Sequence, residues 1–317
     1  MSEQPCPNSR KTRTHWTRLL APVFWGLVGL IVAAFVIWQW QPAHEFMWEY
    51  DEGINAMKAQ LLLDGHSLYS DIWSDQPPLF TLLLAAAFRL FGREVLVGRV
   101  LVLGFCVFGL LAAAWIGRHL GGALTGLAVV VMLALLPAFQ ELSRVIMIGL
   151  PAIDVGLMAM ASGFAYQSGG QMRWLRLSAL MFGLSLLIKP LVAPLYLPLS
   201  ALILLGPERQ STTANRRILR WVEFSVITAV PLLLSLALFS PRPLLRQVLG
   251  TFTQVREARG FILSENLAII SECLFKSDWG VSLAGLLYLA VVGLLDLAIR
   301  RCWSHLVPVG LWVAGTS

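Results

Sequence analysis

The chain has 317 residues, of which 57% are apolar and only 13% are charged, and its formal net charge is +6. A soluble domain carries about 25% charged residues. This composition excludes a soluble enzyme, a secreted disulfide scaffold and a disordered chain. No segment alternates apolar and polar residues with a period of two, which excludes a transmembrane β-barrel.

Apolar runs of about 15–22 residues recur along the chain, and each is long enough to cross a hydrocarbon layer of about 30 Å. The sequence therefore predicts an all-α protein, a polytopic transmembrane helical bundle with about eight or nine spans. The predicted spans cover residues 19–40, 97–117, 121–139, 147–166, 175–188, 190–206, 221–239 and 280–299, and a ninth run begins near Leu306. The ninth run is too short to cross before Ser317, so we expect a single transmembrane domain over 19–317 that is truncated at its C-terminus.

The basic residues orient the predicted spans. Residues 1–18 form a basic tail, and Arg216, Arg217 and Arg220 fall between spans on the same predicted side. The positive-inside rule places that side in the cytoplasm. We therefore expect a multi-pass protein of the cell (inner) membrane with two long extracytoplasmic loops, 41–96 and 240–279. The positive charge serves orientation and does not indicate a nucleic-acid partner.

The first long loop contains two predicted juxtamembrane amphipathic helices. One runs from Asp51, a predicted N-cap, to Gly65, and its apolar residues fall on one face. Pro77 and Pro78 open the second helix, which Gly92 ends. The first is too polar and the second too short to span, so both are expected to lie along the interface and cap the bundle.

The same loop carries a series of short motifs. They are Tyr50-Asp51-Glu52, Gly65, Leu68-Tyr69, Asp71 and Asp75-Gln76-Pro77-Pro78-Leu79. Their order and spacing just after the first span resemble the first loop of GT-C glycosyltransferases, in particular the protein O-mannosyltransferase and aminoarabinose transferase branch. The resemblance is detailed over 48–92 and looser through about residue 205, where Lys189-Pro190 also fits.

The resemblance implies transfer of a sugar from a polyprenyl-phosphate (or diphosphate) carrier to an acceptor on the outer face of the membrane. It assigns Asp51 as the catalytic carboxylate and Glu52 as a neighbour that supports the site or binds substrate. The chemistry agrees, because an attacking hydroxyl needs a base within about 3 Å and the phosphate leaving group needs stabilisation of its developing charge. The alternative is that Asp51 and Glu52 only cap the helix and complement its dipole.

Four further residues are candidates for binding the substrate near the outer surface. Lys189 is expected to contact the carrier phosphate, or else to snorkel at a helix end. Arg144 is expected to hold the phosphate or to pair with the first-loop acids, or else to be an ordinary interfacial arginine. Asp75 and Tyr69 stand in the motif elements, although for Tyr69 an interfacial aromatic residue is favoured over a platform for the sugar.

Asp154 is a fifth candidate, because it lies inside the predicted span 147–166, where an acid is a functional candidate by default. In the family that the chain resembles, an acidic residue stands two positions before the proline. Here that position is Gly149, and Asp154 lies further into the span. This departure leaves open metal binding, a diverged substrate and a weakened enzyme.

No metal ligand and no certain cofactor is predicted. His44 and His66 share the outer compartment with many carboxylates, and some relatives bind a divalent metal there, but no H-x-x-x-H or similar spacing is present. The expected partners are the lipid-linked sugar, membrane lipids and an undefined acceptor. Two alternatives are a lipid or small-solute transporter or flippase and a catalytically silent relative that acts as a binding subunit. The concentration of acids at one surface, instead of in repeated halves near the midplane, favours the enzyme.

Overall fold

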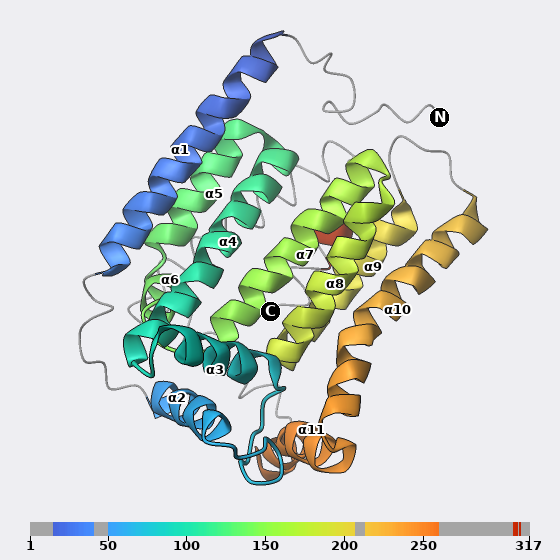
Figure 1. Cartoon of the computed structure of the whole chain (residues 1–317). Coiled ribbons are helices and arrows are strands. Elements are labelled where there is room, and N and C mark those ends of the chain that lie inside the picture. Colours follow the sequence, from blue (N-terminus) through green and yellow to red (C-terminus); the bar gives the residue numbers. More distant parts are fainter. Residues whose placement is uncertain (1–14, 41–49, 207–212, 260–306, 310, 312–317) are drawn as a thin grey trace.

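A computed structural model describes residues 15–40, 50–206, 213–259, 307–309 and 311 (Figure 1). Within these ranges the regular structure is helical apart from one isolated bridge between Leu68 and Ile72, which confirms the predicted all-α class. The helices are α1 (His15–Trp40), α2 (Tyr50–Leu63), α3 (Leu79–Phe91), α4 (Val95–Gly121), α5 (Ala123–Leu135), α6 (Pro137–Leu142), α7 (Gly149–Gly169), α8 (Met172–Ile188), the 3₁₀ helix η2 (Pro190–Leu195), α9 (Tyr196–Leu205), α10 (Ala214–Leu238) and α11 (Pro241–Arg259).

Four of the described helices are long and apolar enough to cross a membrane: α1 over Ala21–Trp40, α4, α7 and α10. The central part of each helix contains few charges, which suits a hydrocarbon layer. The hydrogen bonds within each helix satisfy the backbone N–H and C=O groups, which lipid cannot do. All four coincide with predicted spans. The chain is therefore an integral membrane protein.

The remaining predicted spans are shorter in the structure or fall outside it. The span expected over 121–139 is divided, because α5 ends at Leu135 and Pro137 begins the short helix α6. Helix α8 has 17 residues, and the η2–α9 segment consists of a 3₁₀ helix of 6 residues followed by an α-helix of 10 residues. Both elements lie beside the long helices. The predicted span 280–299 lies outside the described residues, and only residues 307–309 and 311 of the run from Leu306 are described, so the count of eight or nine is not confirmed.

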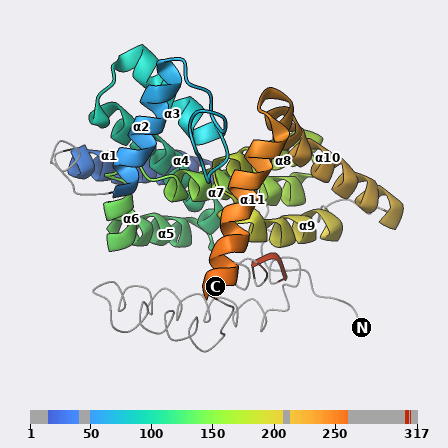
Figure 2. The same ribbon diagram turned by 90° about the horizontal axis from the view of Figure 1, so that it is seen from below.

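The bundle is built around a row of helices in the order α4, α7, α8 and α10, with α5 and α9 against one side of the row (Figures 1 and 2). Hydroxyl groups join these helices by donating to backbone carbonyls. Ser185 Oγ donates to the Ala152 carbonyl at 2.6 Å, and Ser178 Oγ donates to the Ala159 carbonyl at 2.8 Å. Such bonds are typical of helices that pack in a membrane, where apolar burial alone gives little attraction.

The helices α2, α3 and α11, with the connecting residues 64–78, lie at one end of the bundle and form what we call the helical cap (Figures 1 and 2). Two of its helices match the first-loop prediction, and Gly92 ends α3 with a positive φ of 107°. Because α2 begins at Tyr50, Asp51 lies in its first turn, and the prediction that Asp51 is the N-cap is wrong. Helix α11 occupies part of the predicted second outer loop.

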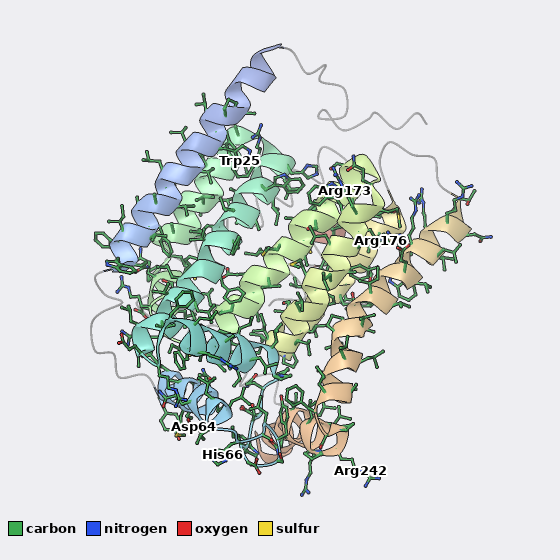
Figure 3. The ribbon with its side chains drawn as sticks, viewed as in Figure 1. Trp25, Asp64, His66, Arg173, Arg176 and Arg242 are labelled. Carbon is green, nitrogen blue, oxygen red and sulfur yellow. The ribbon has the colours of Figure 1, made fainter. Side chains whose placement is uncertain are left out.

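The charged residues divide between the two ends of the molecule. Asp64, His66 and Arg242 lie at the cap, whereas Arg173 and Arg176 lie at the opposite end (Figure 3). At that opposite end Arg176 Nε donates to Glu223 Oε1 at 2.8 Å. Arg173 and Arg176, two of the arginines that the sequence places on the cytoplasmic side, are thus remote from the cap.

Candidate functional site

The buried face of α2 fixes the cap to the bundle. Glu52 and Asn55 lie on this face, and both bind the backbone of Ile146 in the segment before α7. Glu52 Oε1 accepts the Ile146 N–H at 3.1 Å, and Asn55 Nδ2 donates to the Ile146 carbonyl at 2.8 Å. Both backbone polar groups of one buried residue are therefore satisfied by α2, which fixes the position of α2 on this segment.

Glu52 also forms a two-point ion pair with Arg99 of α4. Arg99 Nε donates to Glu52 Oε1 at 2.8 Å, and Arg99 Nη2 donates to Glu52 Oε2 at 2.7 Å. The side chains of Arg99 and Glu52 are only 5% and 7% exposed. Both oxygens of the carboxylate are committed to protein groups, so the geometry gives Glu52 a supporting position and leaves it little capacity to bind substrate.

Asp51 differs from its neighbour, because its side chain is exposed. Within the described part of the chain it has no hydrogen-bond or ion-pair partner. Lys58 follows Asp51 by seven residues, which places the two side chains on the same flank of α2, about 10 Å apart along the axis. An uncommitted carboxylate therefore lies next to the buried face that holds Glu52.

Lys58 and Asp75 form the second ion pair of the cap. Lys58 Nζ lies 3.4 Å from Asp75 Oδ1, and the side chains are 7% and 28% exposed. The other carboxylate oxygen, Oδ2, accepts a bond from Gln76 Nε2 at 3.0 Å. Lys58 also lies over the ring of the exposed Trp73, at 5.6 Å from its centroid. Lys58 was not among the predicted site residues, although the pattern of the amphipathic helix places this lysine beside the apolar face.

Tyr69 is buried in the cap, and its backbone has the left-handed φ of 71°. Its phenol donates to the Gln76 carbonyl at 2.9 Å, and its ring packs edge-on against Phe239 with centroids 5.6 Å apart. Burial, and then the negative charge of Asp75, raise the pKa of the Tyr69 phenol well above its ordinary value. Its role in the structure is to hold the loop that carries Asp75 and Gln76.

Lys189 lies between α8 and η2, and its side chain is half-buried. Its ammonium points at the first residue of α7: Nζ would lie 3.9 Å from a Cβ atom added at Gly149. The Lys189 side chain has no acidic partner and no hydrogen bond among the residues that the structure describes. Gly149 follows Ile146 by three residues, so at most about 11 Å of chain separates the contact of α2 from the contact of Lys189.

The structure gives Arg144 a partner that the sequence did not predict. Arg144 Nε donates to Gln39 Oε1 at 2.6 Å, and Gln39 Nε2 donates to the Gln140 carbonyl at 3.3 Å. In the described residues Arg144 forms no ion pair with a first-loop acid. This contact joins the end of α1 to the segment between α6 and α7.

Asp154 is fully buried between α7 and α4, away from the cap. Neither of its carboxyl oxygens has a hydrogen-bond partner in the described part of the chain. The residue opposite is Gly109 of α4, where an added Cβ would overlap the carboxyl group, and the buried Cys106 lies beside it. The structure therefore does not bring Asp154 together with the residues of the cap.

Over the described ranges no three histidine, cysteine or acidic side chains gather to hold a metal ion, and His44 lies outside those ranges.

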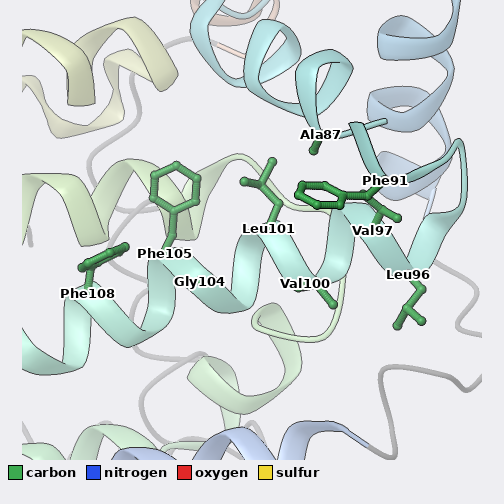
Figure 4. A pocket seen from close by; sticks show the side chains of 9 residues that line it. All are labelled: Ala87, Phe91, Leu96, Val97, Val100, Leu101, Gly104, Phe105 and Phe108. Carbon is green, nitrogen blue, oxygen red and sulfur yellow. The ribbon is translucent and has the colours of Figure 1, made fainter. Parts of the chain in front are cut away.

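A cavity of about 530 Å³ opens between α3 and α4, lined by apolar residues such as Phe91, Val100 and Phe108 (Figure 4). None of the candidate site residues lines this cavity.

A bundle of membrane-crossing helices, with paired and unpaired charges gathered under a helical cap at one end, defines a polytopic membrane protein with a charged site at one surface. The model of the family described as dolichyl-phosphate-mannose-protein mannosyltransferase matches residues 75–242. This is more than half of the chain, and the chain therefore belongs to that family of membrane glycosyltransferases of GT-C type. The resemblance inferred from the first loop is thereby confirmed at the level of the family.

The matched segment begins at Asp75 and includes Arg144, Asp154 and Lys189. Asp51, Glu52 and Tyr69 precede the matched segment. Their proposed roles depend on the structure and on the motifs of the first loop. No curated protein and no solved structure matches the chain.

Proposed function

We propose that this protein transfers a sugar from a polyprenyl-phosphate carrier to an acceptor at the outer surface of the membrane. One observation carries the proposal beyond the family. The segment from Ile146 to Gly149 connects the first turn of α2, with its free carboxylate Asp51, to the unpaired ammonium of Lys189. A base and a cation from distant parts of the sequence thus share one end of the bundle.

Transfer from a phosphate carrier needs these two charges in different roles. The acceptor hydroxyl attacks the anomeric carbon while its proton passes to the Asp51 carboxylate. The new bond joins the anomeric carbon to the acceptor oxygen, and the bond from that carbon to the carrier phosphate breaks. The departing phosphate gains negative charge, which the Lys189 ammonium stabilises. The leaving group is already acidic, so no strong general acid is required.

The remaining candidates support these groups in our proposal. Glu52 positions the turn that carries Asp51, because Arg99 and Ile146 hold its carboxylate. Asp75, fixed by Lys58, has one face toward solvent and contacts the sugar donor. Arg144 positions the connection before α7. Asp154 lies too far into the bundle for this site and serves the packing of α7 on α4.

The proposed orientation follows from the distribution of positive charge. Arg173 and Arg176 lie at the end opposite the cap, and Arg217 and Arg220 belong to the arginine-rich start of α10. Cytoplasmic connections carry the excess of arginine and lysine in membrane proteins. The cap and its site therefore face the extracytoplasmic side, where a lipid-linked sugar can meet an acceptor.

The test is the substitution Asp51→Asn, which removes the base and keeps the shape of the side chain. With dolichyl-phosphate-mannose, the donor in the name of the family, as the labelled substrate in membranes, we expect transfer to fall about 10²–10⁴-fold. The matched control is Asp64→Asn. Asp64 is an exposed acid of the same loop, and its partner is Arg93 at 2.7 Å.

Equal loss in both variants, or wild-type transfer by Asp51→Asn, would show that Asp51 is not the base. Expression and membrane insertion of each variant, measured alongside, separate lost chemistry from lost folding. A cysteine introduced at position 51 that reacts only with reagents on the cytoplasmic side would contradict the proposed orientation.

A further inference from the structure

Gln247 of α11 joins the two predicted outer loops, 41–96 and 240–279. Gln247 Nε2 donates to the Tyr69 carbonyl at 2.8 Å, and Gln247 Oε1 accepts the Ser74 N–H at 2.8 Å. One side chain thus binds backbone groups on both sides of the turn formed by residues 70–73. These partners lie 178 and 173 residues away in the sequence.

The turn that Gln247 binds is strained. Tyr69 has a left-handed φ of 71°, a conformation that is unfavourable for a bulky L-residue and persists only where the surroundings fix it. An apolar cluster around the turn supplies part of that support. It consists of Leu68, Tyr69, Ile72, Leu244 and Val248, with Phe239 against it. Strain of this kind occurs mainly where a loop must present a functional group in one position.

The group presented here is Asp75. Ser74, whose N–H binds Gln247, immediately precedes it, and Ser74 Oγ donates to the Gln76 carbonyl at 3.1 Å, which also accepts the Tyr69 phenol at 2.9 Å. The residues on both sides of Asp75 are therefore fixed, and its carboxylate is left to meet Lys58 at 3.4 Å.

We propose that Gln247 is a positioning residue that acts through Asp75: by holding Tyr69 and Ser74, α11 sets the Asp75 carboxylate for contact with the sugar donor. This inference rests on the proposed function, which gives Asp75 that contact. It assigns a role to α11 that the family match does not, because the matched residues end at position 242.

The first measurement needs no activity. In the purified full-length protein, Gln247→Ala should raise the hydrogen-exchange rate of the Ser74 amide at least tenfold, since that amide loses its acceptor. Leu249→Ala, which truncates an exposed residue of the same helix, is the matched control and should leave the rate unchanged. An unchanged Ser74 rate in Gln247→Ala overturns the proposed clamp.

The second measurement is a double-mutant cycle on the affinity for dolichyl-phosphate-mannose. We expect Gln247→Ala to weaken binding about tenfold in the wild-type background and to have no further effect in Asp75→Asn. A general loss of stability would instead add to the effect of Asp75→Asn. Additive losses, or wild-type affinity in Gln247→Ala, overturn the positioning role, whereas failure of Asp51→Asn to reduce transfer counts against the proposed function alone.

Discussion

Glu52 and Arg99 join the helical cap to the bundle through a buried two-point ion pair at 2.7–2.8 Å. Arg99 lies five residues into α4, a helix that is apolar enough to cross the membrane. A charge at that depth is costly unless it is paired, and Glu52 provides the pair from a helix outside the bundle. The orientation of α2, and with it the position of Asp51, therefore depends on this contact.

The substitution Glu52→Gln should destabilise the protein by about 3–5 kcal/mol, because it removes the negative charge that compensates the buried Arg99 guanidinium. Adding Arg99→Met removes that charge while keeping an unbranched side chain of similar length. We expect the double variant to recover most of the loss, because replacing both members of a buried ion pair is often close to neutral. Thermal unfolding in detergent measures both variants, and a double variant no more stable than Glu52→Gln would contradict this explanation.

Lys189→Met should raise the KM for the lipid-linked donor by about tenfold to a hundredfold, the effect of losing one charged hydrogen bond. Lys189→Arg keeps the charge and should lie much closer to wild type. Steady-state kinetics with dolichyl-phosphate-mannose distinguishes the two. A KM unchanged in Lys189→Met would mean that the ammonium does not contact the phosphate.

Gly149 offers an independent test of the same ammonium. A side chain at this position begins 3.9 Å from Lys189 Nζ, so Gly149→Asp should form an ion pair there and compete with a bound phosphate. We expect an increased KM for the donor in Gly149→Asp and no such increase in Gly149→Ala, whose methyl group makes only ordinary contact. Equal KM values for the two variants would show that Gly149 does not lie beside the proposed phosphate site.

Gly109→Ala should destabilise the bundle by about 1–3 kcal/mol, because the new methyl group would overlap the buried Asp154 carboxyl. In the Asp154→Ala background that group is absent, so the same change should cost much less. Unfolding of the four proteins of this cycle in detergent gives the coupling directly. Additive losses would show that α4 and α7 do not approach closely at this point.

Tyr69 makes stability depend on pH in the alkaline range. Its pKa is raised in the folded protein by burial and by Asp75, so the folded state retains a proton that the unfolded chain loses near pH 10. The contribution of Tyr69 to stability is therefore complete below about pH 10 and declines as the pH rises above it. Tyr69→Phe should make the alkaline unfolding curve shallower, and identical curves for the two proteins would contradict this assignment.

Local signals in the sequence predicted much of the fold. Apolar length located α1, α4, α7 and α10, and Pro78 and Gly92 gave the limits of α3 within one residue. The break at Pro137 was missed, because the apolar run continues across it and hydropathy does not register a change of helix.

The candidate site was predictable only in part, because its contacts join distant residues. An arginine inside a predicted span is itself a signal, yet nothing local to Arg99 indicates Glu52, which lies 47 positions earlier. Lys58 and Gln247 likewise gain their roles from partners 17 and up to 178 residues away. Periodicity predicts which face of a helix is buried, but not which side chain of another element meets it.

Neutral hydroxyl-to-carbonyl bonds hold α7 against α8, whereas the cap is held in part by charged pairs that reach solvent, such as Asp64 with Arg93. Salt weakens ion pairs between exposed side chains and leaves bonds between neutral groups largely unaffected. Ionic strength should therefore loosen the surface layer of this molecule while its membrane-embedded layer stays intact.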